Sequence, residues 1–464
     1  MTIVSEQQQT ASLSENTGRL SFSLRMSLLR DSTSYFVSRI IPGLTGVISV
    51  PILIRLIGIE EYGRLAVILP FLLAIGGAGS GWLTQGILRF HPSPSETDAR
   101  AARFKSAIVL GTVLSLWTMA IVLIPVVLRL QYSAATALLV EGFCFAFLVY
   151  SVVLGRLQAQ LQPLGVMKRE GLRSVGGLAI AVVLVLVTGR KDFQLVLLGL
   201  GIAYALALVL TLRIGPPVRK AIEHFNEDAR SKSDSAKAIL RHLWHYGWAV
   251  GLWLLISQML PVIDRWTIQK FVGYTQAGVY ASLYEVAVRS FSFFAIPLAQ
   301  AAHPRIMRSW NDGEYSVARD IINSTMKYQV LIFAPIFVVV VVFARRITSL
   351  VLGLDNATAA SVLPVLVLGG FLWQLALLVH KPLEIRQQTK AMLWGMAVVV
   401  FLSLVANLLL VPRFGYAAAA YVLVFSSSSY LIYVFFAARL FGGMRPSIIV
   451  NDSGQQRLDD DRKV

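Results

Sequence analysis

The sequence predicts an all-α polytopic membrane protein of about twelve transmembrane helices, arranged as two six-helix lobes around a central cavity. Three observations support this fold class. Hydrophobic residues make up 56% of the 464 residues, charged residues only 14%, and the mean hydropathy is +0.66. The apolar residues gather in long segments with almost no charge, such as residues 330–343 and 397–411. A short motif also recurs at a fixed offset of 215 residues, from Arg55 to Lys270, which is typical of one structural unit used twice.

The apolar segments are long enough to be membrane-spanning helices. A helix of about 20 apolar residues crosses the bilayer core, and a soluble protein could not bury this much apolar surface. The runs are too long for the alternating strands of about ten residues in a membrane barrel. The first half has six predicted spans, at Tyr35–Ile57, Tyr62–Leu83, Phe104–Leu128, Ser133–Leu154, Leu172–Thr188 and Phe193–Ile214. The second half has six more, at His245–Trp266, Gln276–Ala299, Tyr328–Leu350, Ser361–Val379, Met392–Val411 and Tyr416–Leu440.

The basic residues predict the orientation of these spans. With the N-terminus in the cytoplasm, most of the 42 Lys and Arg residues fall in cytoplasmic tails and loops, so both termini are predicted to be cytoplasmic. This distribution accounts for the net charge of +17, and nucleic acid is not needed as a partner. The predicted organisation is a cytoplasmic tail (1–33), an N-terminal lobe (34–215), a cytoplasmic linker (216–243), a C-terminal lobe (244–441) and a second cytoplasmic tail (442–464).

The two copies of the repeat lie where one apolar segment ends and the next begins. Each copy has a basic residue, a glycine three positions later and another glycine five further on. The matched residues are Arg55, Gly58 and Gly63, and Lys270, Gly273 and Gly278. Because six spans precede the linker, the second half enters the membrane in the same orientation as the first, so the repeat is parallel. We expect these hairpins to take part in gating between the lobes.

These hairpin segments resemble those of bacterial polysaccharide flippases. The segment Arg55–Gly63 resembles the first hairpin, and Asp264-Arg265 with the following Gly273 and Gly278 resembles the second. The resemblance runs from about residue 30 to 440 and is to O-antigen and exopolysaccharide flippases of the multidrug/oligosaccharidyl-lipid/polysaccharide exporter superfamily. It implies two lobes facing each other across a cavity, and transport of an oligosaccharide on a polyprenyl pyrophosphate carrier to the outer leaflet of the bacterial inner membrane. The implied partners are this lipid-linked oligosaccharide, membrane lipids, and components that polymerise or export the polysaccharide.

A charged pair in the eighth predicted span is the most informative candidate site. Arg289 lies eleven residues after Gly278, about 16 Å along a helix, which is near the middle of a bilayer core of about 30 Å. Glu285 precedes it by four residues and so shares its helix face. One interpretation is a self-neutralised structural ion pair. The interpretation that we favour is a functional cation in a cavity, since a charge at the membrane midplane is costly to keep for stability alone.

Basic residues at the ends of spans are further candidates for the cavity. A pyrophosphate needs cations in a polar cavity, and we predict Arg39 and Lys381 as cavity residues because apolar sequence flanks both. Most basic residues at the same ends, including Arg173, are expected to reach lipid headgroups. Asp264 and Arg265 close the seventh span, where an interlobe or hinge contact and an exposed ion pair are equally favoured. Arg265 is also a candidate for the cationic cavity.

Acidic residues within the spans are candidates for ion coupling. Glu141 lies about 12 Å into the fourth span, where desolvation favours the protonated carboxyl. Proton coupling through Glu141 or Glu285 is one interpretation, and a buried acid bonded to a neighbouring helix is the other. Asp264 is a third candidate for coupling or ion pairing.

The sequence also bears on other functional classes. It has no G-x-x-x-x-G-K-[ST] phosphate loop, no H-E-x-x-H motif and no metal-ligand spacing among its six histidines, so we expect no cofactor, metal or catalytic residue. Two alternatives stay open. A membrane-embedded glycan polymerase or acyltransferase is disfavoured, because such enzymes need catalytic residues at one membrane face, often on long outer loops, and the outer loops here are short. A multidrug exporter of the same fold would differ only in the polarity and size of its cavity.

Overall fold

The computed structural model describes residues 41–92, 98–129, 133–160, 162–214, 229–311, 313–353, 355–386 and 388–440. Both predicted tails and part of the predicted linker lie outside these residues. Every regular element in the described ranges is a helix. The predicted all-α fold class is therefore confirmed.

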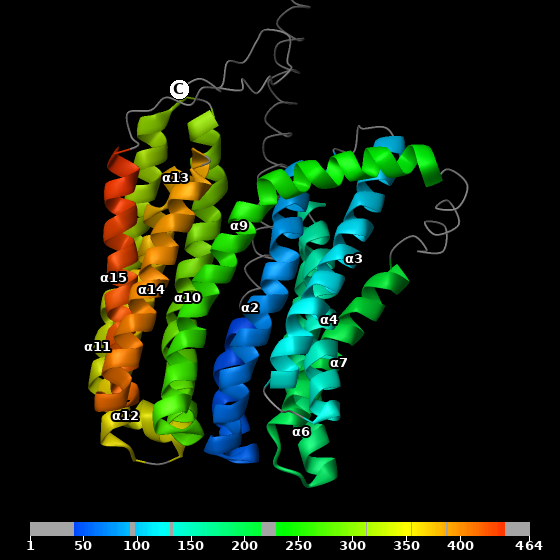
Figure 1. Ribbon diagram of the computed structural model, residues 1–464. Helices are drawn as coiled ribbons and strands as arrows, with labels where there is room; N and C mark the ends of the chain where they lie inside the picture. The colour runs from blue at the N-terminus through cyan, green and yellow to red at the C-terminus, as the bar shows by residue number, and fades with distance from the viewer. Residues whose placement is uncertain are drawn as a thin grey trace, which may run out of the picture.

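The first half of the chain forms the helices on the right of Figure 1. Its first described helix covers Ile41–Ile57. The helices that follow are α2 (Ile59–Phe90), α3 (Asp98–Arg129), α4 (Ala134–Ala159), α5 (Pro163–Gly171), the π-helical turn η1 (Leu172–Gly176), α6 (Gly177–Thr188) and α7 (Phe193–Ile214). Because α5, η1 and α6 continue one another, they form a single span, Leu164–Thr188.

The second half begins earlier than the sequence predicts. Its helices are α9 (Ala229–Val272), α10 (Tyr274–Asn311), α11 (Tyr315–Leu352), α12 (Ala357–Val379), α13 (Lys381–Ile385), α14 (Thr389–Phe414) and α15 (Tyr416–Leu440). Residues 229–243, which we assigned to the linker, are thus the start of α9. In Figure 1 this 44-residue helix crosses over the helices of the first half and then descends beside α10.

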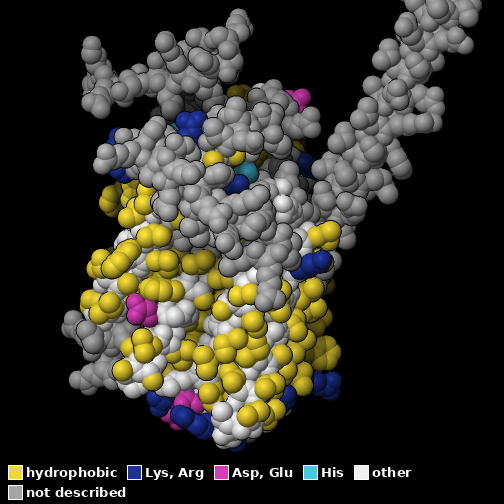
Figure 2. Space-filling model, turned by 90° about the vertical axis from the view of Figure 1, so that its right-hand side faces the viewer, with side chains coloured by type: hydrophobic (Ala, Val, Ile, Leu, Met, Phe, Trp, Pro, Cys, Tyr) yellow, Lys and Arg dark blue, Asp and Glu magenta, His cyan; other side chains and the backbone are white. Residues whose placement is uncertain are grey.

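Ten of the described helical segments are long and apolar enough to cross a membrane. Two further helices account for the predicted total of twelve. Ile41–Ile57 is apolar but is described only from residue 41 onwards, and α10 is 38 residues long and carries Glu285 and Arg289. Figure 2 shows hydrophobic side chains over most of the visible face, with Lys and Arg mainly near its upper and lower edges. This is the distribution expected for a protein surrounded by lipid.

The two repeated hairpins have the same local structure. Gly58 precedes α2 with a φ of 87°, and Gly273 precedes α10 with a φ of 102°. Side chains other than glycine rarely adopt this left-handed region. The matched glycines in the sequence motif are therefore explained by a turn that each half makes at the same point.

The two hairpins also pack against each other. A Cβ atom built on Gly63 would lie 2.0 Å from the carbonyl oxygen of Tyr274, and one built on Gly278 would lie 2.4 Å from the carbonyl oxygen of Ile59. These two contacts are exchanged by the 215-residue offset, so the interface is self-complementary like that of a two-fold dimer. It joins the halves at what we call the hairpin end, where α2 and α10 lie side by side.

Helix α9 connects the two halves along the rest of their length. Near its start, Trp244 packs edge-on against Trp82 of α2, with ring centroids 5.2 Å apart. Closer to its end, Asp264 accepts a hydrogen bond from Asn407 of α14. The same helix therefore contacts both halves of the molecule.

Candidate functional site

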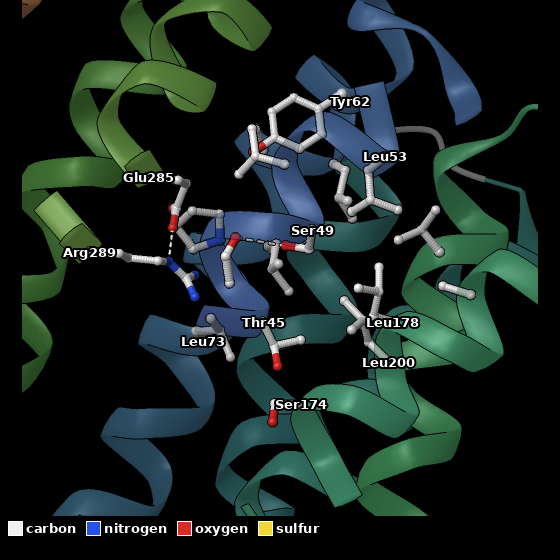
Figure 3. A pocket seen from close by; sticks show the side chains of 18 of the residues that line it. Thr45, Ser49, Leu53, Tyr62, Leu73, Ser174, Leu178, Leu200, Glu285 and Arg289 are labelled. Atoms are coloured by element: carbon white, nitrogen blue, oxygen red, sulfur yellow. Dashed lines mark hydrogen bonds and ion pairs between the residues drawn. The ribbon is translucent and has the colours of Figure 1, made fainter. Parts of the chain in front are cut away.

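A cavity lies between the two halves. Its volume is about 350 Å³, near the lower end of the range for ligand pockets. One wall comes from the helix Ile41–Ile57, α2, the π-turn η1, α6 and α7 of the first half. The other wall comes from α9 and α10 of the second half, and Figure 3 shows Arg289 and Glu285 reaching inwards from it.

On the wall from the second half, two arginines form ion pairs with the same glutamate. Arg265 Nη2 donates a hydrogen bond of 2.8 Å to Glu285 Oε1, and Arg289 Nε bonds the other carboxylate oxygen. The Arg265 side chain is almost fully buried, whereas that of Arg289 is 46% exposed. The predicted pair between Glu285 and Arg289 is therefore present. It is not a self-neutralised pair, because the second guanidinium leaves the group of three with one net positive charge.

Both arginines also contact the opposite wall. Arg265 Nη1 donates to the backbone oxygen of Ala66 on α2, at 3.2 Å. The Arg289 guanidinium lies against Gly46 of the first helix, where a Cβ atom would be 2.0 Å from Nη1. The two cations thus bridge the halves of the molecule, which agrees with their prediction as cavity or interlobe residues.

Asp264 has a different environment from its neighbour Arg265. It is 1% exposed and accepts hydrogen bonds of 2.8 Å from the Tyr280 hydroxyl and the Asn407 amide. Consecutive residues on a helix do not share a face, so Asp264 is directed into the second half while Arg265 faces the cavity. The expected interlobe contact belongs to Arg265, and the alternative of an exposed ion pair is wrong.

Of three other predicted residues, two lie in the described part of the chain, and neither lines the cavity. Arg39 lies outside the described residues. Lys381 is on the short helix α13, where it bonds Glu384, and it is not among the described residues that line the cavity. Glu141 is partly exposed on α4 and likewise does not line it. Lys381 was predicted from its place at the end of a span and from the apolar sequence that flanks it, and neither fixes which way a side chain points.

Sequence reasoning missed the cation and the hydroxyls of the first wall. Arg173 and Ser174 lie on the π-turn η1 and line the cavity, so the expectation that Arg173 reaches lipid headgroups is wrong. Arg173 is held by Glu170 through two hydrogen bonds of 3.3 and 3.0 Å. The spacing of three residues between Glu170 and Arg173 was the available signal, but nothing in the sequence marks the π-turn that directs Arg173 inwards.

The sequence matches a family described as "Polysaccharide biosynthesis protein" over residues 28–310, which is more than half of the chain. The chain belongs to this polysaccharide biosynthesis protein family. A more distant relative is an uncharacterized membrane protein of Methanocaldococcus jannaschii, 22% identical over 208 residues. That match covers 43% of this chain and 40% of the relative, so the chain spans less than half of the relative's length.

Solved structures of transporters share the fold. The lipid II flippase MurJ in an inward closed conformation has a TM-score of 0.66 and 12% identity, over 89% of this chain and 87% of that one. A multidrug resistance MATE family transporter of the MOP superfamily, in an inward-facing conformation, has a TM-score of 0.60 and 12% identity, over 88% and 94%. A MOP superfamily transporter from Pyrococcus furiosus, described by reverse polarity of its binding pocket that suggests a different function, has a TM-score of 0.53 and 12% identity, over 89% and 94%.

Family and fold together confirm the resemblance seen in the hairpin residues. This member of the polysaccharide biosynthesis protein family is a multi-pass membrane protein with the two-lobe transporter fold of the MOP superfamily. The cavity between its lobes is where such a transporter would hold its cargo.

Proposed function

We propose that this protein flips a polyprenyl-pyrophosphate-linked oligosaccharide across the bacterial inner membrane for surface polysaccharide assembly. The observation that carries the proposal is the net positive charge of the group formed by Arg265, Glu285 and Arg289. A pyrophosphate is a compact, multiply charged anion. Guanidinium groups bind such anions with paired, charge-assisted hydrogen bonds.

The solvent exposure of the two arginine side chains indicates which of them the cargo would contact first. Arg265 is almost fully buried and already donates to both Glu285 and Ala66. Arg289 is about half exposed at the cavity, so its remaining N–H groups are free to reach an anion. Because it also touches Gly46 of the opposite lobe, an anion drawn to Arg289 would loosen or replace a contact between the lobes. Cargo binding would then be linked to lobe movement.

A multidrug exporter is the second candidate function. The likeness to MATE family transporters favours it. The charge of the cavity does not favour a cationic drug, because desolvated like charges repel strongly in a site of low dielectric constant. Membrane polymerase or acyltransferase activity has no support from the transporter fold.

For ion coupling we propose Asp264 among the three predicted carboxylates. Glu285 is held by two arginines, and Glu141 lies away from the cavity. Asp264 is buried on the helix that joins the lobes, and its recorded hydrogen-bond partners are neutral groups, Tyr280 and Asn407. Protonating it would therefore break no ion pair. Uptake of a proton there would instead change how α9 packs on α10 and α14.

The proposal is tested by a flipping assay in vesicles. The protein is reconstituted with a polyprenyl-pyrophosphate-linked oligosaccharide, and a glycosidase added outside measures how fast inner-leaflet substrate becomes accessible. We expect flipping well above that of protein-free vesicles and about tenfold slower flipping for Arg289→Gln, which corresponds to about 1.4 kcal/mol. Arg346→Gln, which removes an arginine of α11 that does not line the cavity, is the matched control and should flip normally. Vesicles that transport a cationic dye but leave the lipid-linked glycan protected would support drug export instead.

A further inference from the structure

The wall opposite Arg265 and Arg289 is mostly apolar, but it carries three hydroxyl groups whose protons are already used in hydrogen bonds. Thr45 Oγ1 donates to the Ile41 oxygen at 2.8 Å, Ser49 Oγ to the Gly46 oxygen at 2.8 Å and Ser174 Oγ to the Glu170 oxygen at 2.7 Å. A hydroxyl has one proton to donate and two lone pairs that accept. Bonded in this way, the three oxygens face the cavity as hydrogen-bond acceptors (Figure 3).

The cation of the same wall has its charge compensated. Arg173 holds both oxygens of Glu170, and Glu170 is fixed in turn by a hydrogen bond of 2.6 Å from the Tyr150 hydroxyl. The Arg173 guanidinium also lies 5.5 Å from the centre of the Tyr204 ring. It thus offers N–H donors that are held in place, and its charge is offset by the Glu170 carboxylate.

The hydroxyls and Arg173 lie among apolar side chains such as Leu178 and Leu200 on one wall of the cavity, and we call this group of polar residues the N-lobe wall. It consists of Thr45 and Ser49 of the first helix and Arg173 and Ser174 of the π-turn η1. The first helix approaches the π-turn closely, since a Cβ atom on Gly171 would lie 4.0 Å from Ile41. A π-turn inside a longer helix is uncommon and is often found at functional sites.

This chemistry does not suit a phosphate. A pyrophosphate at neutral pH has mainly acceptor oxygens, so it cannot bond a row of acceptors and it gains little from a compensated arginine. A sugar ring has hydroxyls that both donate and accept, and it is uncharged. Given the proposed function, on which this inference rests, we infer that the N-lobe wall binds the hydroxyls of the sugar attached to the pyrophosphate. The arginines of the second lobe hold the pyrophosphate itself.

The division of roles has a consequence for specificity. The sugar would donate to the oxygens of Thr45, Ser49 and Ser174 and accept from Arg173. Loss of one such acceptor weakens binding by a modest factor, since a neutral hydrogen bond contributes little net free energy. Loss of two should be clearly measurable. The effect should depend on the presence of the sugar, whereas a loss at Arg289 should not.

Two defined probes test this inference by calorimetric titration into protein in lipid nanodiscs. One is farnesyl pyrophosphate, and the other is the same molecule carrying a single glucose on the pyrophosphate. We expect the wild type to bind the glucose-bearing probe about tenfold more tightly. In the double variant Thr45→Val, Ser174→Ala this ratio should fall to about twofold, with binding of bare farnesyl pyrophosphate unchanged. Arg289→Gln should weaken both probes by the same factor of about ten.

Matched controls separate this effect from loss of structure. Thr112 and Ser151 make the same kind of hydroxyl-to-carbonyl hydrogen bond in the first lobe, each of 2.8 Å, but do not line the cavity. The double variant Thr112→Val, Ser151→Ala should keep the tenfold ratio. The double variant Glu170→Gln, Arg173→Gln removes both charges of this ion pair together, and it should also lower the ratio.

The outcomes distinguish the inference from the proposed function. The inference is overturned if the wild type binds both probes with equal affinity, or if the Thr45→Val, Ser174→Ala variant loses affinity for both probes equally. In either case the N-lobe wall does not bind the sugar. The proposed function would still stand in that case, provided that Arg289→Gln weakens both probes. If the wild type binds neither probe, the proposed function fails and the inference fails with it.

Discussion

The two halves of this protein are alike at the hairpin end and unlike at the cavity. At the hairpins the 215-residue offset pairs glycine with glycine, Gly58 with Gly273 and Gly63 with Gly278, and the backbone contacts are exchanged by the same offset. At the cavity the same offset relates each charged residue of the second half to an apolar residue of the first half. Arg265 corresponds to Val50, Glu285 to Pro70 and Arg289 to Ala74.

This difference separates what the repeat provides from what the cargo requires. Close packing of two identical turns needs the same small residue in both copies, because either glycine would clash if it gained a side chain. An anion needs cations only where it binds, and charge in a membrane is costly wherever it has no use. A symmetric scaffold with a one-sided charge is therefore expected for a carrier whose cargo has one charged group. The following predictions test each side of that comparison.

The largest expected loss of stability comes from a change in the charged group of Arg265, Glu285 and Arg289. Glu285→Gln would leave the buried Arg265 guanidinium without its carboxylate, and removing one partner of a buried pair costs about 3–5 kcal/mol. Thermal unfolding in detergent measures the loss. On the first lobe, Glu60 pairs with Arg64 at the same spacing of four residues but with both side chains exposed. Glu60→Gln should therefore cost less than about 1 kcal/mol. Equal losses for the two variants would mean that the cavity group is not held by charge.

Substitutions at the symmetric hairpins should cause an intermediate loss of stability. Gly63→Ala and Gly278→Ala each place a methyl group against a backbone carbonyl of the other lobe, and overpacking of this kind costs about 1–3 kcal/mol. Gly77, on α2, is the control, because a Cβ atom there meets nothing within 4 Å. Its replacement by alanine should be neutral or stabilising by about 0.5–1 kcal/mol. The comparison predicts similar losses for Gly63 and Gly278, and a loss at only one of them would show that the contact is not self-complementary.

The smallest effect on stability is expected at Asp264. In Asp264→Asn the amide oxygen still accepts a hydrogen bond from Tyr280 or Asn407. The free energy of unfolding should therefore change by about 1 kcal/mol or less. The same variant cannot take up a proton, and its flipping rate should lose any dependence on pH that the wild type shows. A pH dependence that persists unchanged would assign coupling to another carboxylate.

The sequence predicted the symmetric part of the structure better than the asymmetric part. Glycines at matched positions imply the same turn, and Glu285 four residues before Arg289 implies a pair on one helix face; both are present. The spans were also predicted from apolar length alone, including α10, which carries Glu285 and Arg289. Helical periodicity and glycine geometry are local properties, so a single sequence can reveal them.

What the sequence did not predict depends on contacts between distant segments or on irregular backbone. Arg173 lines the cavity from a π-turn, and Arg265 shares Glu285 with Arg289 because α9 and α10 pack side by side. Lys381 was predicted for the cavity from its place at the end of a span, but α13 directs it to Glu384. None of these orientations follows from composition or spacing.

The most direct test of the account is a structure of the protein with farnesyl pyrophosphate bound in lipid nanodiscs. We predict density for the pyrophosphate between the lobes, within hydrogen-bond distance of the Arg289 guanidinium. Density for the pyrophosphate at a site away from Arg265 and Arg289, with this cavity empty, would contradict the claim that the one-sided charge exists to bind the anionic group of a lipid carrier.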